Sequence, residues 1–412
     1  MTRPTQNPLG SRGPLCLFVR LCGLVACAAI AGAQTPPAAK PAAAPNAPAA
    51  KPAAAPGAPA AAPAPPPRRP DVVSPEVNAD GRVTFRLFAP NARAVTVNGI
   101  RHLPDQEMTR DDKGVWSATV GPLGADVYSY TFSIDGAIVT DPHDRDIKKY
   151  FQSESLFEVP GKPPILAAMQ AVPHGVVHHE FYASKVRGGE AGVEVYTPPG
   201  YDPRGATLYP VVYLLHGFGD REEAWVDSGH ANWIADNLIA QARIEPAIIV
   251  MPYGHPVEVM DRDKIKDYGE KNDAAMEKDL IGNIIPLVER DYRADPRAKR
   301  RAIVGLSMGG GQSLRIGLVH PELFGWVGAF SAGGPEKDFD KTFAAIAKDP
   351  SLRPSLLWIG VGKEDHLLKR NAALHDWLVQ KGIVHTWVVS EGGHEWPVWR
   401  AYLPQFLELI FR

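Results

Sequence analysis

The feature that most constrains the fold is a series of near-continuous apolar runs in residues 162–412. Uninterrupted runs of this kind indicate strands that are buried on both faces of a parallel sheet. Helix-length stretches separate them, which predicts right-handed βαβ units and an α/β domain with helices on both faces of the sheet. An antiparallel pair over 176–185 and 192–196 is expected to precede six further strands, over 210–215, 247–251, 301–305, 325–330, 356–361 and 386–389.

Residues 71–161 follow a different pattern, in which apolar side chains recur at every second position. Val83, Phe85 and Leu87 alternate with more polar neighbours, as in a strand with one buried face. The Asp135-Gly136 pair between two such runs is a strong signal for a tight hairpin. Short strands are expected over 83–88, 94–97, 115–120 and 128–134, and together they predict a small all-β sandwich.

The first 33 residues have the pattern of a signal peptide. Arg3, Arg12 and Arg20 supply positive charge, 21–30 is apolar, and Ala31-Gly32-Ala33 offers a cleavage site. About ten apolar residues are too few to span a bilayer, which needs about 20. We therefore expect export, to the periplasm or the medium, and no membrane span. The stretch Leu24–Cys27 leaves a second possibility open, a lipid anchor on Cys27.

Residues 34–70 predict a semi-rigid linker, since 13 of these 37 residues are proline and 16 are alanine. The three cysteines, Cys16, Cys22 and Cys27, all lie in the signal segment, so the exported protein is expected to have no disulfide. The chain carries 44 basic and 46 acidic residues and a net charge of −2. This balance gives no basic excess, and no nucleic-acid partner is expected.

The motif Gly305-Leu306-Ser307-Met308-Gly309 follows the apolar run over 301–305 and precedes a helix-compatible stretch. A strand, G-x-S-x-G and a helix in this order form the nucleophile elbow of α/β-hydrolases. The serine occupies a strained turn, and the glycines let strand and helix approach closely. Ser307 is therefore the candidate nucleophile.

A nucleophilic serine needs a base, and in this fold the base follows the last strand. His394 lies on the loop after the run over 386–389, whereas His320, His366, His375 and His385 lie elsewhere. We therefore expect His394 to be the base.

The orienting acid is expected on the loop after the penultimate strand. Asp365 occupies that position, and Glu364 is its nearest rival. Neighbouring residues in an extended loop point in opposite directions, so Asp365 is favoured.

The backbone N–H groups of Phe218 and Met308 are expected to bind the oxyanion of the reaction. Phe218 lies in the small-residue loop His216-Gly217-Phe218-Gly219, and Met308 follows the nucleophile. His216 is expected to hold this loop. No metal site and no cofactor are predicted, because no His, Asp or Glu cluster shows ligand spacing in the sequence.

These motifs, together with Gly392-Gly393-His394-Glu395-Trp396, resemble the esterase D-like family. That family includes feruloyl and acetyl xylan esterases, enterochelin esterases and mycolyltransferases. The stretch Phe88–Ala92 and Thr140-Asp141-Pro142 resemble the early-set immunoglobulin-like modules that precede some of these enzymes. The resemblance implies an α/β-hydrolase domain over 162–412, preceded by an immunoglobulin-like sandwich over 71–161.

The resemblance implies an exported serine carboxylic-ester hydrolase that removes feruloyl or acetyl groups from plant polysaccharide. Trp225, Trp396 and Tyr253 are candidate substrate-binding residues, although the tryptophans fit a core equally well. A siderophore esterase, an acyltransferase, and a carbohydrate-binding envelope protein with an inert hydrolase domain remain alternatives. The sandwich is expected to position the enzyme, and glycan binding by it is left open.

Overall fold

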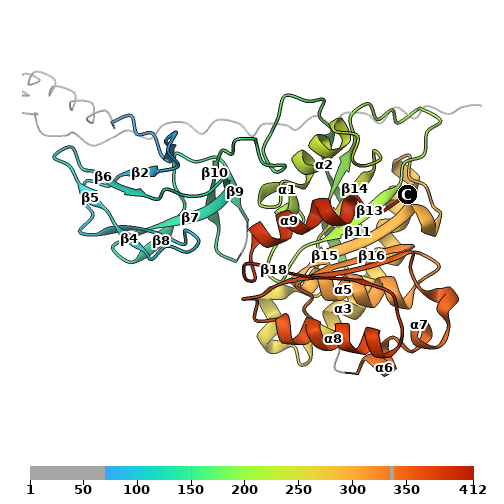
Figure 1. Cartoon of the computed structure of the whole chain (residues 1–412). Helices are drawn as coiled ribbons and strands as arrows, with labels where there is room; N and C mark the ends of the chain where they lie inside the picture. The colour runs from blue at the N-terminus through green and yellow to red at the C-terminus, as the bar shows by residue number, and fades with distance from the viewer. Residues whose placement is uncertain (1–69, 150, 335–337) are drawn as a thin grey trace, which may run out of the picture. The chain divides into compact units, whose positions relative to one another are not determined.

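The computed structural model describes residues 70–149, 151–334 and 338–412. The predicted signal peptide, with Cys27, and all of the predicted linker except Pro70 lie outside these residues. Two sheets form the sandwich that precedes the hydrolase, and a third sheet forms the centre of the hydrolase (Figure 1). The boundary at residues 161 and 162 stays a prediction.

The sandwich consists of two antiparallel sheets that pack face to face. Their shared core is aromatic, and it includes Phe85, Tyr130, Phe132 and Phe157. One sheet has the order β1-β2-β6-β5, with β1 over Glu76–Val77, β2 over Val83–Phe88, β6 over Val115–Val120 and β5 over Thr109–Arg110. The other has the order β4-β3-β7-β10-β9, with β4 over Gln106–Glu107, β3 over Val95–Asn98, β7 over Asp126–Ile134, β10 over Glu154–Val159 and β9 over Ile147–Lys148, and with β8 (Ala137–Val139) paired to β7.

The predicted hairpin at Asp135-Gly136 is confirmed. It joins β7 to β8, and both turn residues have positive φ, 49° and 91°. Positive φ at both central positions is the requirement of a type I′ turn. The Asp135 carboxylate also accepts the backbone N–H groups of Arg93 and Ala94, which ties the turn to the start of β3.

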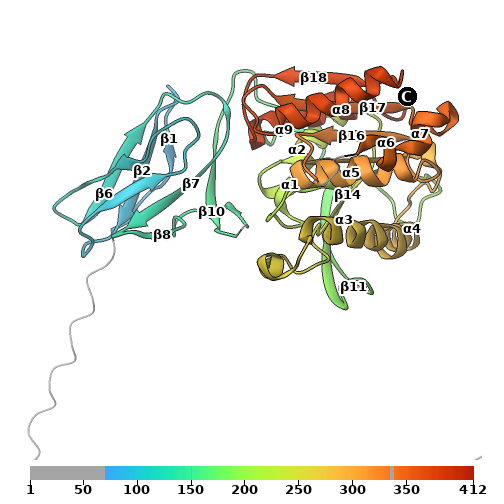
Figure 2. The same ribbon diagram turned by 90° about the horizontal axis from the view of Figure 1, so that it is seen from below.

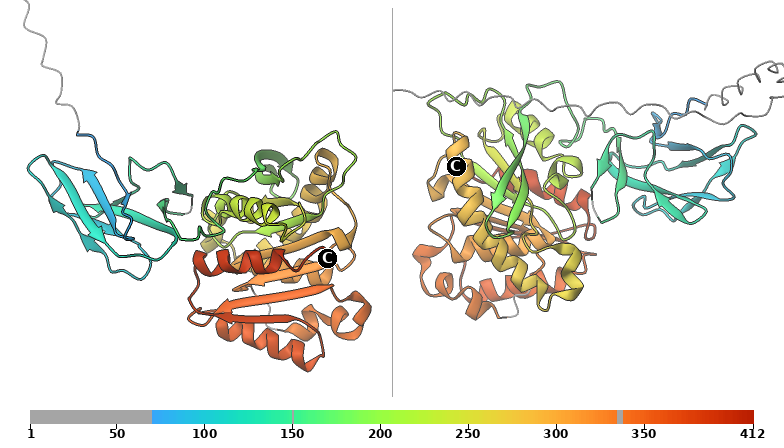
Figure 3. Two further views of the ribbon diagram at one scale, coloured as in Figure 1. Left: turned by 45° about the horizontal axis from the view of Figure 1, so that its top comes forward. Right: turned by 180° about the vertical axis from the view of Figure 1, so that it is seen from behind.

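The hydrolase sheet has eight strands in the order β11-β12-β14-β13-β15-β16-β17-β18. The first two form a long antiparallel ribbon, green in the right panel of Figure 3, and β12 pairs with β14 in the same antiparallel manner. All later pairs are parallel. The eight predicted strands are therefore confirmed: β11 Val176–Ser184, β12 Gly189–Thr197, β13 Val211–Leu215, β14 Ile248–Pro252, β15 Arg301–Leu306, β16 Trp326–Phe330, β17 Leu356–Gly362 and β18 Thr386–Ser390.

Helices cover both faces of this sheet (Figures 1 and 2). One face packs against α1 (Ala224–Asp227), α2 (Ala231–Ala240) and α9 (Trp396–Leu407). The other packs against α3 (Tyr268–Asp279), α4 (Ile285–Asp291), α5 (Ser307–Val319) and α8 (Leu368–Gln380). Short turns complete the chain: η1 Val259–Lys264, η3 Ala298–Arg300, α6 Phe339–Thr342, α7 Ala344–Lys348 and η4 Pro350–Leu352.

The helical stretch that contains α3 and α4 is not one regular α-helix. A π-helical turn, η2 (Leu280–Ile284), separates α3 from α4. Pro286 lies in the first turn of α4 and has no N–H to donate to the preceding turn. The change of helix type therefore coincides with the proline. None of the helices in the described ranges has the length and apolar character needed to cross a membrane.

Arg400 of α9 joins the hydrolase to the sandwich through a buried ion pair. Its guanidinium donates to Asp126 at 3.1 and 2.8 Å, to the carbonyl of Val127 at 2.7 Å and to the carbonyl of Ser228 at 2.6 Å. The Arg400 side chain is only 5% exposed. A second pair, Arg101–Glu395 at 2.7 Å, lies beside it.

Asp126→Ala should lower the free energy of unfolding by about 3 kcal/mol, because it leaves the buried Arg400 guanidinium without its counter-ion. Urea unfolding followed by tryptophan fluorescence would measure this loss. Arg243→Ala is the matched control, since it removes an exposed pair with Glu408 and should cost less than about 1 kcal/mol. Equal losses in the two variants would contradict a stabilising role for the buried pair.

Candidate active site

Ser307 occupies a strained turn between β15 and α5, with φ at 51°. A Cβ at Gly305 would come within 2.7 Å of the backbone of Gly309, and a Cβ at Gly309 within 2.5 Å of the carbonyl oxygen of His216. Both distances are closer than side-chain contacts allow, so these positions accept only glycine. The tight packing brings the serine to the carboxyl end of the sheet.

Ser307, His394 and Asp365 form a continuous chain of hydrogen bonds. Ser307 Oγ lies 2.9 Å from His394 Nε2, and His394 Nδ1 lies 3.1 and 3.0 Å from the two carboxylate oxygens of Asp365. A carboxylate only accepts hydrogen bonds, so Nδ1 carries the proton and Nε2 is left to accept from the serine. This is the arrangement that activates a serine for nucleophilic attack.

Asp365 is buried and is held in several directions. The Leu367 N–H donates to its Oδ1 at 2.7 Å, and the side chains of His394 and Ser331 donate as well. Burial alone would raise the pKa of Asp365, but these hydrogen bonds outweigh it and lower the pKa. The carboxylate therefore stays charged. Ser331 was not identified from the sequence, and it is fixed in turn by Trp399 Nε1 at 3.0 Å.

Glu364, the rival acid, points away from the imidazole. Its side chain is 54% exposed, and its carboxylate accepts the backbone N–H of Gly392 at 2.7 Å. It braces the loop that carries His394 without contacting the ring. The side chains of Glu364 and Asp365 thus point in different directions, as expected for neighbouring residues of an extended loop.

Two buried histidines hold the loop over 216–220. His216 Nδ1 donates to the carbonyl of Gly217 at 2.8 Å, and its Nε2 accepts the N–H of Gly254 at 2.7 Å. Burial lowers the pKa of His216 to about 4, which keeps the ring neutral and able to accept. His216 therefore has the structural contacts expected of it.

His255 is the second of these histidines, and sequence reasoning missed it. Its Nε2 accepts the Gly219 N–H at 3.0 Å, and its Nδ1 lies 2.8 Å from the hydroxyl of Tyr268. Burial, with a smaller effect of His216, lowers the pKa of His255 to about 3. The histidine in Tyr253-Gly254-His255 gives no local sign of this role, because its partner lies 36 residues away.

The two expected oxyanion donors lie at the ends of different elements. Met308 is the second residue of α5, where backbone N–H groups have no partner within the helix. Phe218 lies on the loop after β13, and its ring packs edge-on against His255. This placement is compatible with two donors that converge beside Ser307, near a helix N-terminus.

Ser307 and His394 open onto a cavity of about 430 Å³, a size typical of small-molecule sites. The hydrolase contributes a mixed wall that includes Phe218, Asp220, Trp396 and Trp399. The sandwich contributes Arg101, Val127, Tyr128, Ser129, Lys148 and Leu156. Nothing in the sequence indicates that residues of the sandwich, more than 140 positions before the serine, line its cavity.

The three aromatic residues considered as substrate contacts have different environments. Trp396 lines the cavity. Trp225 is fully buried and donates to the carbonyl of Leu215 at 3.0 Å, so it is a core residue and not a wall of the cavity. Tyr253 is half-buried, its ring lies near the guanidinium groups of Arg187 and Arg221, and it is not among the residues that line this cavity.

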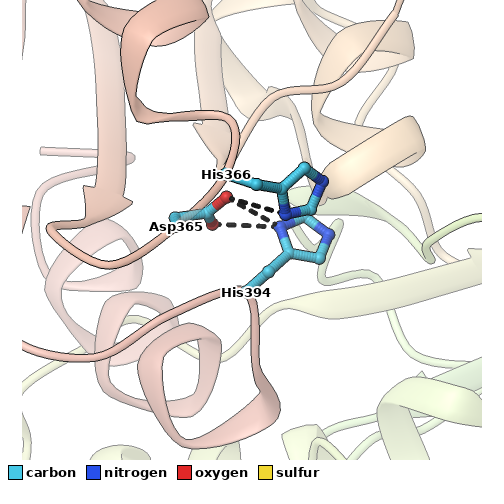
Figure 4. Close-up of side chains that lie close together, drawn as sticks. All are labelled: Asp365, His366 and His394. Carbon is cyan, nitrogen blue, oxygen red and sulfur yellow. Dashed lines mark hydrogen bonds and ion pairs between the residues drawn. The ribbon is translucent and has the colours of Figure 1, made fainter.

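Within the described residues, two groups of side chains hold possible metal-ligand atoms within 4.8 Å of one another, a proximity that sequence spacing did not reveal. The first comprises Asp365, His366 and His394 (Figure 4). Its atoms already take part in the hydrogen-bond chain, and His366 approaches Asp365 only to 3.6 Å. The second comprises His179, Glu194 and Glu223, where His179 pairs with Glu194 at 2.5 Å and Lys149 with Glu223 at 2.7 Å.

Comparison with protein families gives two matches along the chain. Residues 73–144 match carbohydrate-binding module 48, the isoamylase N-terminal domain. Residues 184–410 match the Esterase family. The two matches fall on the sandwich and on the hydrolase, respectively.

Among curated proteins, the chain is 32% identical over 347 residues to an endo-1,4-beta-xylanase/feruloyl esterase of Xylanibacter ruminicola. The match covers 82% of this chain and 46% of the relative, so the chain spans about half the length of that protein. An acetyl esterase of Caldicellulosiruptor saccharolyticus is 23% identical over 233 residues, covering 48% of this chain and 81% of the relative.

Two solved structures extend the comparison. The CE1 ferulic acid esterase of Anaeromyces mucronatus, in complex with ferulic acid, is 27% identical with a TM-score of 0.54, and the match covers 61% of this chain and 96% of that one. The enterobactin esterase of Shigella flexneri is 21% identical with a TM-score of 0.57, over 79% and 92%. The second likeness concerns the fold alone. Because the family match runs from β12 through α9 and includes Ser307, Asp365 and His394, the chain belongs to the Esterase family.

Proposed function

We propose that this protein is a serine carboxylic-ester hydrolase that removes feruloyl or acetyl groups from plant polysaccharide. The observation that carries the proposal is the hydrogen-bond chain from Ser307 through His394 to Asp365, at the wall of a cavity that is partly aromatic. Export by residues 1–33 belongs to the same proposal, since polysaccharide substrates lie outside the cell.

In the first step, Ser307 Oγ attacks the ester carbonyl while His394 Nε2 takes the serine proton. Their separation of 2.9 Å suits direct transfer. The charge that develops on the imidazole is offset by Asp365, which the surrounding donors keep ionised. The carbonyl oxygen of the ester becomes negative at the same time, and the N–H groups of Phe218 and Met308 are proposed to stabilise it.

The bond between the carbonyl carbon and the alcohol oxygen then breaks, His394 gives its proton to the leaving alcohol, and the acyl group stays on Ser307. Water then attacks the acyl-enzyme, with His394 again as the base. The serine is regenerated by the same proton path in reverse. No step requires a metal ion or a cofactor, since Asp365 and His394 act through charge and proton transfer, and the group of His179, Glu194 and Glu223 has no part in the reaction.

The substrate class rests on three features of the chain and its relatives. The relatives include enzymes named for feruloyl and acetyl esters, and the N-terminal match is to a carbohydrate-binding module. The cavity also joins apolar side chains, such as Trp396 and Leu156, to charged ones, such as Lys148. An aromatic acyl group attached to a sugar matches this lining, because it combines an apolar ring with polar hydroxyl groups. A siderophore ester or transfer to a sugar hydroxyl is the alternative.

Ser307→Ala and His394→Ala should each remove nearly all of kcat, and the double variant should be little worse than either single one. Nucleophile and base act as one unit, so their losses do not add. Asp365→Asn should lose less than Ser307→Ala but still orders of magnitude, because an amide favours the wrong imidazole tautomer. Hydrolysis of p-nitrophenyl acetate measures these effects.

Glu364→Gln is the matched control for the acid, since it changes the neighbouring carboxyl and should stay within a few-fold of wild type. Circular dichroism should be unchanged in all these variants. If Glu364→Gln were the crippled enzyme and Asp365→Asn were not, the acid would be Glu364. Substantial activity in Ser307→Ala would end the serine-hydrolase proposal.

The substrate proposal is tested with methyl ferulate, p-nitrophenyl acetate, longer acyl esters and intact arabinoxylan. We expect kcat/KM to be highest for the feruloyl or the acetyl ester and to fall for longer aliphatic acids. Release of ferulate or acetate from arabinoxylan should accompany it. Preference for a catecholate siderophore ester, or acyl transfer to added sugar in place of hydrolysis, would identify one of the alternatives.

A further inference from the structure

A charged pair links the sandwich to the oxyanion loop inside the cavity. Lys148, the last residue of β9, places its Nζ 3.7 Å from Oδ1 of Asp220 and 3.5 Å from Oε2 of Glu154. The side chains of Lys148 and Asp220 are only 12% and 7% exposed. Both residues line the cavity that contains Ser307. The pair is therefore largely shielded from bulk solvent. Charges in such an environment interact more strongly and over a longer range than charges in water.

Asp220 lies unusually close to the site where negative charge develops. A Cβ at Gly217 would be 3.5 Å from Asp220 Oδ2 and 3.6 Å from Ser307 Cβ, so this carboxylate oxygen and Ser307 Cβ are at most about 7 Å apart. Asp220 also closes the loop that carries the Phe218 N–H, through a turn in which its own N–H donates to the carbonyl of Gly217. An ionised carboxylate here would oppose the oxyanion.

Two like charges at this separation repel one another strongly in a site shielded from water. The oxyanion forms only on the way to the transition state, so the repulsion would slow the chemical step without weakening substrate binding. A cation that offsets Asp220 would remove this penalty, and Lys148 is placed to do so.

We infer that Lys148 of the sandwich is a positioning residue for catalysis, which acts by neutralising Asp220 beside the oxyanion hole. The inference rests on the proposed ester hydrolysis and deepens it, because it assigns the sandwich an electrostatic part in that reaction. Docking of the sandwich then sets the charge balance of the catalytic cavity, in addition to shaping its wall.

The protonation of Asp220 gives the inference a distinctive pH dependence. Burial raises the pKa of Asp220 to about 6, with Lys148 opposing the rise and Glu154 adding to it. Without Lys148 the pKa would rise further, so Asp220 would be neutral at low pH and charged only at higher pH. The cost of losing Lys148 should therefore grow as the pH increases.

The other charged groups of this cavity are Arg101, Glu395, Arg400 and the base His394. A substitution at Lys148 leaves all of them in place. Their own titration is therefore common to the variant and the wild-type enzyme, whereas Glu154, which faces Lys148 from β10, loses its cation together with Asp220.

The experiment measures kcat and KM of Lys148→Met with p-nitrophenyl acetate between pH 6 and pH 9. Acetate is too small to need the distal part of the cavity, so a change reports on the chemical step. We expect kcat to fall about tenfold or more at the upper end of this range, with KM within about twofold of wild type. The ratio of variant to wild-type kcat should decline steadily with rising pH.

Removing the second charge supplies the decisive comparison. In an Asp220→Asn background, Lys148→Met should change kcat by less than about twofold, because the carboxylate beside the oxyanion loop is gone and Glu154, the other partner of Lys148, does not line the cavity. Lys148→Arg should retain most of the activity, since it preserves the positive charge.

Lys149→Met is the matched control for docking. Lys149 is the adjacent residue, it also bridges the sandwich to the hydrolase through Glu223, and it does not line the cavity of Ser307. Its loss should leave the pH profile of kcat unchanged. A similar loss in Lys149→Met, an equal loss with and without Asp220, or a pH-independent loss would overturn the inference. An inactive wild-type enzyme would instead refute the proposed function.

Discussion

The close packing of β13, β15 and α5 at two glycines is the constraint on which the rest of the site depends. Gly305 and Gly309 leave no room for a side chain against the carbonyls of Leu215 and His216. This contact forces Ser307 into a positive φ and also sets the start of the loop that carries Phe218. The nucleophile and the oxyanion loop are thus placed by one and the same contact.

Much of the fold could be predicted from the sequence because its signals are local. The eight strands of the hydrolase are near-continuous apolar runs, and the Asp135-Gly136 turn is marked by two residues that tolerate positive φ. The positions of Asp365 and His394 could be predicted because each residue lies on the loop after one of the last two strands. The π-helical turn before Pro286 could not be predicted, since the spacing of apolar residues does not register a missing N–H.

What could not be predicted depends on contacts between distant segments. His255 and Ser331 have no neighbouring motif, and each acquires its role from a partner on another element. Trp225 and Trp396 look alike in the sequence, but one is buried in the core and the other lines the cavity. The same holds for Lys148 and Arg101, whose position beside the catalytic residues requires the sandwich to be docked.

Helix α9 links the catalytic residues of the hydrolase to the N-terminal sandwich. It begins two residues after His394, contributes Trp399 to the support of Ser331, and presents Arg400 to Asp126 of the sandwich. If the sandwich were replaced by that of a relative, the new sandwich would therefore contact a helix α9 whose side chains had evolved against a different sandwich. Recombination in this family should preserve activity only when the N-terminal module and the C-terminal helix are inherited together, although almost the whole hydrolase lies between them in the gene.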